Sequence, residues 1–180
     1  MRKNIQLFTL FLGIAIVQSC QKDTKFLITE TTVGPLSQNT KIEELETVFA
    51  QDSIVRDTTV ALSASAKKID IFEKGGKHLL IITPSSDSIP KVENVRIMDK
   101  RYVSDNGVGL TSTFGEIKRK YPIKKIVATL SSVVVFPENS NLYFTIDKEE
   151  LPENLRFSTK VEEVQIPDEA KIKYLMLGWE

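Results

Sequence analysis

The chain has few side chains that are able to do covalent or proton-transfer chemistry. It holds one cysteine, Cys20, and one histidine, His78. A histidine acts as a general acid or base only when its reaction partner lies within hydrogen-bond reach. His78 follows Gly75-Gly76, which is typical of a hairpin turn, so we expect a solvated turn residue. Zinc needs three or four Cys, His or carboxylate ligands. We therefore predict no metal site, no cofactor and no catalytic residues.

A glycine-containing loop is the other candidate for chemistry. Gly107-Val108-Gly109-Leu110 runs through Thr111 and Ser112 into a predicted helix, and backbone N–H groups at a helix start bind anions. No Gly-Lys-Ser/Thr follows, so this is not a P-loop. A structural loop that caps the helix explains the same residues. The candidate contacts to an anion or a partner are Gly107, Gly109, Thr111, Ser112, Thr113, Lys118 and Arg119.

The N-terminal residues have the layout of a secretory signal. Arg2 and Lys3 are followed by the uncharged, mostly apolar stretch Leu7–Val17, and then by Gln18-Ser19-Cys20. The apolar stretch is short for a transmembrane helix, which needs about 20 residues. We predict a signal peptide over residues 1–19, with cleavage between Ser19 and Cys20.

This N-terminus resembles the lipobox of bacterial lipoproteins, with a signal like those of the Bacteroidota. The resemblance covers only the segment that ends at Cys20, and it implies that Cys20 carries the lipid, palmitate included, that attaches the protein to a membrane. Gln18 departs from the enterobacterial pattern, in which a small or β-branched residue is usual. The residue after Cys20 is Gln21, so the Asp that retains enterobacterial lipoproteins in the inner membrane is absent. The resemblance therefore implies an outer-membrane lipoprotein, on the periplasmic face or the cell surface.

Composition constrains the partner of the mature chain. Removal of residues 1–19 takes away Arg2 and Lys3, which leaves 22 basic and 24 acidic side chains. This balance gives no reason to expect nucleic acid as a partner. A chain of this size buries roughly 70% of its unfolded surface, enough for one core. We expect residues 20–25 to form a lipidated tether and residues 26–180 to form a single domain.

An internal repeat is predicted from the spacing of apolar residues. The same spacing of apolar residues occurs twice, first in Ile42, Leu45, Phe49 and Ile54-Val55 and again in Phe114, Ile117, Tyr121 and Ile126-Val127. Ile71-Phe72 likewise matches Val135-Phe136, and Val92–Asp99 matches Val161–Asp168. We predict repeat one over about residues 26–99 and repeat two over about residues 100–180. The alternative is two unrelated stretches that share helix and strand periodicity.

The repeat pattern predicts an α+β domain. Each unit reads as a strand, a helix and then several strands, with Thr40–Glu43 and Thr113–Glu116 as capping boxes at the two helix starts. Short connections favour antiparallel pairing. We therefore expect one mostly antiparallel sheet with both helices packed on one face. The pattern looks like that of the β-lactamase-inhibitor and outer-membrane-assembly lipoprotein folds, a likeness of fold that carries no residue roles.

The functional prediction from the sequence is a binding or scaffolding protein rather than an enzyme. We expect a lipid-anchored envelope protein that holds an envelope protein or a glycan. Two alternatives remain open at this stage. One is a metal-independent envelope hydrolase that uses Asp or Glu, and the other is a purely structural envelope component.

Overall fold

The structure, a computed structural model, describes residues 24–56 and 68–179. The predicted signal peptide and Cys20 lie outside the described residues. The described chain is mostly β, with twelve strands in two sheets and two short α-helices. The helices are α1 (Leu45–Val48) and α2 (Phe114–Lys120).

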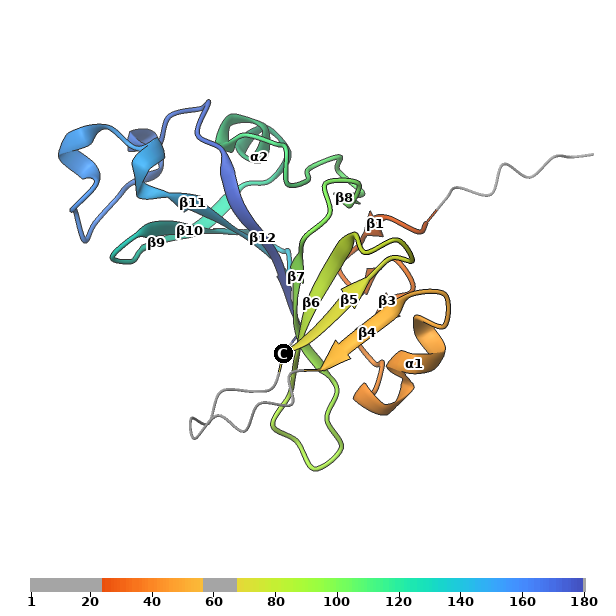
Figure 1. Cartoon of the computed structure of the whole chain (residues 1–180). Coiled ribbons are helices and arrows are strands. Elements are labelled where there is room, and N and C mark those ends of the chain that lie inside the picture. Colours follow the sequence, from red (N-terminus) through yellow and green to blue (C-terminus); the bar gives the residue numbers. More distant parts are fainter. Residues whose placement is uncertain (1–23, 57–67, 180) are drawn as a thin grey trace, which may run out of the picture.

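The large sheet has eight strands in the order β4-β5-β6-β7-β12-β11-β10-β9, and all of its neighbouring pairs are antiparallel (Figure 1). In chain order, each half of this sheet follows a short helix. The first half is made of β4 (Ser53–Arg56), β5 (Ile69–Phe72), β6 (His78–Pro84) and β7 (Val92–Ile97). The second half is made of β9 (Ile123–Ala128), β10 (Ser132–Pro137), β11 (Leu142–Asp147) and β12 (Ile172–Gly178). The halves meet where β7 pairs with β12.

The small sheet has the order β3-β2-β1-β8. Its strands are β1 (Leu27–Ile28), β2 (Thr32–Val33), β3 (Leu36–Ser37) and β8 (Val103–Ser104). β1 and β8 run parallel, with Leu27 opposite Val103, so the start of the domain is joined to its middle. Short 3-10 turns complete the described chain: Ile42–Glu44, Lys148–Glu150, Glu153–Leu155 and Glu163–Gln165.

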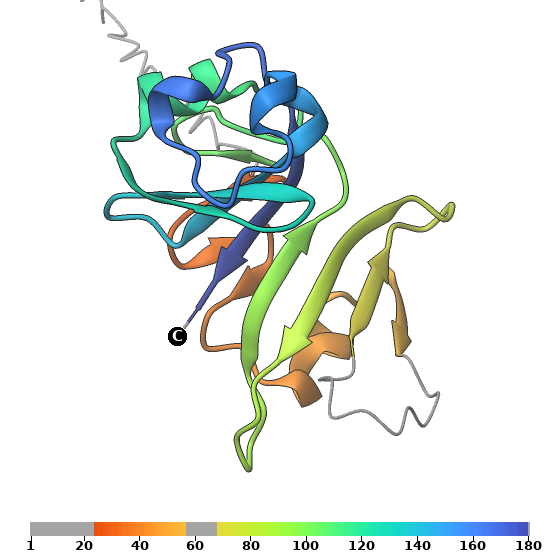
Figure 2. The same ribbon diagram turned by 90° about the vertical axis from the view of Figure 1, so that its left-hand side faces the viewer.

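Buried and less buried side chains alternate along β5 and β10, and β7, β11 and β12 follow the same pattern with local breaks. On the core side of the large sheet lie Ile71, Leu80, Val95, Leu175 and Phe144, all fully buried or nearly so. Ile28, Val33 and Leu36 of the small sheet belong to the same apolar cluster. In Figures 1 and 2 the small sheet and α1 lie on one side of β4–β7, and no described helix lies on the other.

The predicted α+β class is wrong, because strands rather than helices dominate the described structure. Ile42, Leu45 and Phe49 supply only a 3-10 turn and four α-helical residues. So short a helix is marginal alone and depends on tertiary packing. The apolar cover of the core is shared by the small sheet, the two short helices and the loops around Leu151 and Ile166. The expected arrangement of a single sheet with helices on one face is therefore also wrong.

Two local predictions also differ from the structure. The first helix begins one residue later than expected, since the Lys41 N–H donates to the Glu44 carboxylate at 2.9 Å and Thr40 instead bonds back to Ser37. Val161–Asp168, which the repeat matches to Val92–Asp99, contains a 3-10 turn rather than a strand. The stretch 170–179, which the sequence indicates as the close of repeat two, does supply its last strand, Ile172–Gly178. The expected pairing of Thr113 with Glu116 at the start of α2 is confirmed, at 3.0 Å.

Candidate functional site

The loop predicted to contact an anion is bonded mainly to its own chain. Gly107 adopts a positive φ of 79° in the turn after β8, and the Gly109 N–H donates to Ser112 Oγ at 3.3 Å. Ser112 is buried. The loop thus closes on itself before α2 begins, which is the structural role that the sequence left open.

The start of α2 is occupied in the same way. The Phe114 N–H donates to the Ala170 carbonyl at 2.9 Å, and the Gly115 N–H donates to the Asp168 carbonyl at 2.8 Å. Lys118 pairs with the Asp168 carboxylate at 2.7 Å, whereas Arg119 is exposed. Carbonyl groups of the segment before β12 therefore already accept hydrogen bonds from the N–H groups that would bind an anion. Thr111 is exposed and Thr113 half-buried, so the seven candidate residues do not converge on one point.

His78 differs from the expected solvated turn residue. It is half-buried, its ring is stacked on Phe72 with the centroids 4.4 Å apart, and its Nε2 lies 2.9 Å from Asp70 Oδ1. The close approach to Asp70 lacks hydrogen-bond geometry. Catalysis by a His–carboxylate pair also needs a nucleophile beside the imidazole. Among the described residues, no hydroxyl is hydrogen-bonded to His78.

Within residues 24–56 and 68–179, three carboxylates have displaced pKa values, and each belongs to an ion pair. Hydrogen bonds from Arg101 and then Lys25 lower the pKa of Glu73 to about 2. Burial alone would raise the pKa of Asp99, but hydrogen bonds from Arg101 and Lys77 outweigh it and hold the pKa at about 2. A hydrogen bond from Lys173 lowers the pKa of Asp147. These carboxylates stay ionised at neutral pH, whereas a carboxylic general acid needs a raised pKa.

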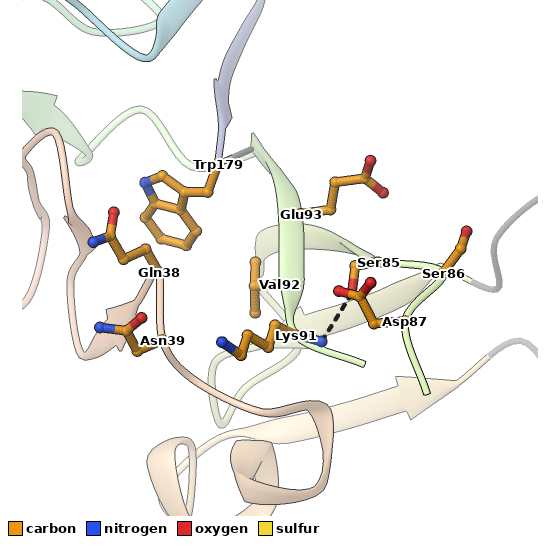
Figure 3. Close-up of a pocket in the computed structure, with 9 residues that line it drawn as sticks. All are labelled: Gln38, Asn39, Ser85, Ser86, Asp87, Lys91, Val92, Glu93 and Trp179. Carbon is orange, nitrogen blue, oxygen red and sulfur yellow. Dashed lines mark hydrogen bonds between the residues drawn. The ribbon is translucent and has the colours of Figure 1, made fainter. Parts of the chain in front are cut away.

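A polar pocket of about 520 Å³ opens beside the start of β7 (Figure 3). Gln38, Asn39 and Trp179 lie on one side of the strand, while Asp87 and Glu93 lie on the other. Ser85 Oγ donates to the Asp87 carboxylate at 2.9 Å and accepts the Lys91 N–H at 3.1 Å. Most of the polar lining residues are exposed and point in different directions, so the pocket suits a weakly held polar solute better than a reaction.

Trp179 joins this pocket to both halves of the large sheet. It is 6% exposed, its backbone N–H donates to the Glu93 carbonyl, and its indole N–H donates to the Glu30 carbonyl at 2.9 Å. The Glu30 carboxylate in turn accepts from Ser140 Oγ and the Asn141 N–H. The indole therefore has a structural role, because it connects the end of β12 to the Glu30 backbone, and little of its ring surface is left for a ligand.

The half-exposed side of the large sheet is the most distinctive surface of the described chain. On the five central strands, alternate side chains point away from the core and form what we name the open face. It consists of Ile81, Thr83, Asn94, Arg96, Ser132, Val134, Phe136, Tyr143, Thr145, Asp147, Tyr174 and Met176. Ten of these twelve side chains are uncharged, although charged residues make up 27% of the sequence; the charged ones are Arg96 and Asp147, and Asp147 pairs with Lys173.

Aromatic contacts organise the open face. The Phe136 and Tyr143 rings are stacked with centroids 5.6 Å apart, and Asn94 donates to the Tyr143 hydroxyl. The guanidinium carbon of Arg96 lies 3.6 Å from the centre of the Tyr174 ring. Tyr143 is opposite Met176, and Met176 is opposite Arg96, so these side chains form a continuous row across β10, β11, β12 and β7. A row of rings with one cation is suited to binding rather than to bond cleavage.

This surface was not among the sites predicted from the sequence. Its signal was present as polar or aromatic residues alternating with core residues, for example Asn94 and Arg96 around Val95, or Tyr174 and Met176 around Leu175. Alternation shows that a strand has two faces. It does not show that five such strands are neighbours.

Over residues 24–56 and 68–179, no group of three or more Cys, His, Asp or Glu side chains is arranged to hold a metal ion. The same residues contain no helix with the length and apolar character required to span a bilayer.

Comparison with known proteins places the fold alone. No family model and no curated protein matches the sequence. A crystal structure of the uncharacterized protein yfeY from Escherichia coli is similar, with a TM-score of 0.56 and 19% sequence identity. The match covers 87% of this chain and 100% of the other. At this identity the likeness concerns the arrangement of strands and says nothing of a shared activity.

Proposed function

We propose that the chain is a lipid-anchored protein of the cell envelope that binds a partner without catalysis, through the open face. The observation that carries the proposal is the composition of that face. Isolated apolar side chains are ordinary on protein surfaces, whereas a contiguous set rimmed by polar residues is typical of an interaction site. The open face spans five adjacent strands and includes Phe136, Tyr143, Tyr174 and Met176.

The proposed anchor is Cys20, and its support is the N-terminal sequence alone. Five residues separate Cys20 from Phe26, a span of at most about 20 Å when extended. An acylated Cys20 would therefore hold the domain close to the membrane. Metabolic labelling with a fatty-acid precursor tests this step. Label on the wild type and none on Cys20→Ala is expected, whereas equal labelling of the two would overturn the anchor.

The binding step is tested in living cells with a photo-crosslinking amino acid. We would place benzoylphenylalanine at Tyr143 on the open face and, as the matched control, at Thr47, an exposed position of α1. We expect a discrete adduct of higher mass from position 143 and none from position 47. Adducts of equal yield from both positions, or none from position 143, would refute the open face as the binding surface.

A further inference from the structure

We infer that the occupant of the open face is an amphipathic helix of a partner protein, which brings an apolar stripe and a carboxylate to Arg96. The inference rests on the proposed function and names the class of partner. The first observation in its favour is that Arg96 has no carboxylate partner among the described residues. The others are the residue types around Arg96 and the hydrogen bonds already made within the sheet.

Arg96 is a half-buried cation without a carboxylate partner. Among the described residues no acidic side chain lies within ion-pair distance of it, whereas Arg101 pairs with Asp99 and Glu73, and Arg56 pairs with Glu46. Its Nε is enclosed by protein and makes no hydrogen bond. The guanidinium carbon instead lies over the Tyr174 ring, 3.6 Å from its centre. A charge withdrawn from water in this way is stabilised when a carboxylate meets it, because Arg–carboxylate hydrogen bonds are charge-assisted.

The residue types around Arg96 favour a protein partner. Aromatic residues, Met and Arg are enriched in the centres of protein–protein interfaces, and Lys and Glu are depleted there. The open face carries Phe136, Tyr143, Tyr174 and Met176 in addition to Arg96. None of its twelve positions is Lys or Glu, and its acidic residue, Asp147, is already paired with Lys173. An ordinary solvated sheet face would carry several such charges. Tyr and Arg are also the residues that most often dominate binding energy when they lie near the centre of an interface.

The hydrogen bonds of the sheet favour a helix over an extended segment. The central strands exchange their backbone hydrogen bonds with their neighbours on both sides, so they offer none to a segment lying across them. The Asn94 amide is already bonded to Tyr143. A segment buried there must satisfy its own backbone N–H and C=O groups, as a helix does. Helices bind such surfaces through apolar residues at positions i, i+3, i+4 and i+7.

The shape of the sheet agrees with a helical occupant. β9–β11 lie at a marked angle to β4–β7, and the side of the sheet turned away from α1 and the small sheet is the inner side of this bend (Figure 1). Five strands spaced about 4.8 Å apart span about 19 Å, the length of roughly 13 helical residues. A helix of about four turns laid across the strands would therefore reach from Phe136 past Arg96.

The test uses two synthetic peptides of about 18 residues, a length that covers this span. Both are capped, Ala-rich helices with a Leu stripe, and they differ by one central residue beside the stripe, Glu in one and Gln in the other. Affinity for the purified mature domain is measured by fluorescence anisotropy at low salt. A charge-assisted hydrogen bond contributes enough to predict at least about tenfold tighter binding of the Glu peptide.

Variants of Arg96 test whether the preference for the Glu peptide over the Gln peptide depends on this side chain. In Arg96→Met the preference for the Glu peptide should fall below about twofold, while Arg96→Lys, which keeps the charge but not the planar fork, should retain part of it. Arg119→Met on α2 removes the same charge from an exposed position elsewhere and should leave the preference unchanged. Circular dichroism confirms that each variant is folded before its affinity is interpreted.

Three outcomes would overturn the inference. They are equal affinity for the two peptides, no binding of either, and a preference that survives Arg96→Met. An oligogalacturonate, whose sugar rings carry carboxylates, is measured in parallel. Binding of this glycan alone, lost in Arg96→Met, would replace the helix with an acidic glycan. A position-143 crosslink in cells together with any of these results would leave the proposed function standing and refute only the class of partner.

Discussion

Asp99→Asn should make the domain less stable at neutral pH and less sensitive to acid. The Asp99 side chain is inaccessible to solvent, and its carboxylate accepts from the Arg101 guanidinium at 2.7 and 3.0 Å and from the Arg101 N–H at 2.9 Å. Lys77 lies 3.2 Å away. Arg101 also pairs with Glu73, so the cluster joins the turn after β7 to the β5–β6 hairpin. Asparagine keeps the shape and removes the charge.

The size of the expected stability loss follows from the pKa of Asp99, which is lowered from its ordinary value of 3.8 to about 2 in the folded protein. At about 1.4 kcal/mol per pKa unit, this difference corresponds to roughly 2 kcal/mol of stability at pH 7. Because the folded-state pKa is lowered, the contribution is complete above about pH 5 and is lost as the pH falls toward 2. By pH 3 about half of it should be gone.

Urea unfolding measures both quantities, with the fluorescence of Trp179, the only tryptophan of the chain, as the signal. We expect Asp99→Asn to lower the free energy of unfolding by about 2 kcal/mol at pH 7 and by about 1 kcal/mol at pH 3. Asp105→Asn, the same change at an exposed carboxylate, should have little effect at either pH. A loss for Asp99→Asn that is equal at the two pH values, or one no larger than that of Asp105→Asn, would show that the cluster does not stabilise the fold electrostatically.

Three further substitutions are tested by the same unfolding measurement. Phe144→Ala on β11 should cost about 3–5 kcal/mol, because the ring is fully buried, and a loss below 1 kcal/mol would mean that the core differs from the one described. Gly109→Ala should cost about 1–3 kcal/mol, since its Cβ would lie 2.7 Å from the Tyr102 carbonyl oxygen; unchanged stability would show that this loop yields easily. Leu130→Ser at the β9–β10 turn should stay within about 0.5 kcal/mol, because Leu130 is 96% exposed, and a larger loss would indicate a hidden contact.

Local structure was predictable where neighbouring residues decide it. The Gly75-Gly76 hairpin turn is confirmed, with φ values of 109° and 88° that glycine adopts without strain. The start of α2 is confirmed as well, because a capping box involves residues only three apart. The tandem repeat stays a prediction. Each half of the large sheet does follow a short helix, and superposition of residues 31–98 on 104–168 tests it directly.

The sequence by itself determined the alternation along each strand, the caps and turns, the near balance of charge and the signal-like N-terminus that ends at Cys20. Only the tertiary structure decided which strands are neighbours. Pairing β7 with β12 places Arg96 opposite Met176, about 80 residues apart in the chain, and brings Tyr174 under its guanidinium. Tertiary packing also places the Asp168 and Ala170 carbonyls where they accept hydrogen bonds from the N–H groups at the start of α2. Such contacts depend on burial and on long-range strand pairing, which residue spacing does not encode, and so the open face was visible only in the fold.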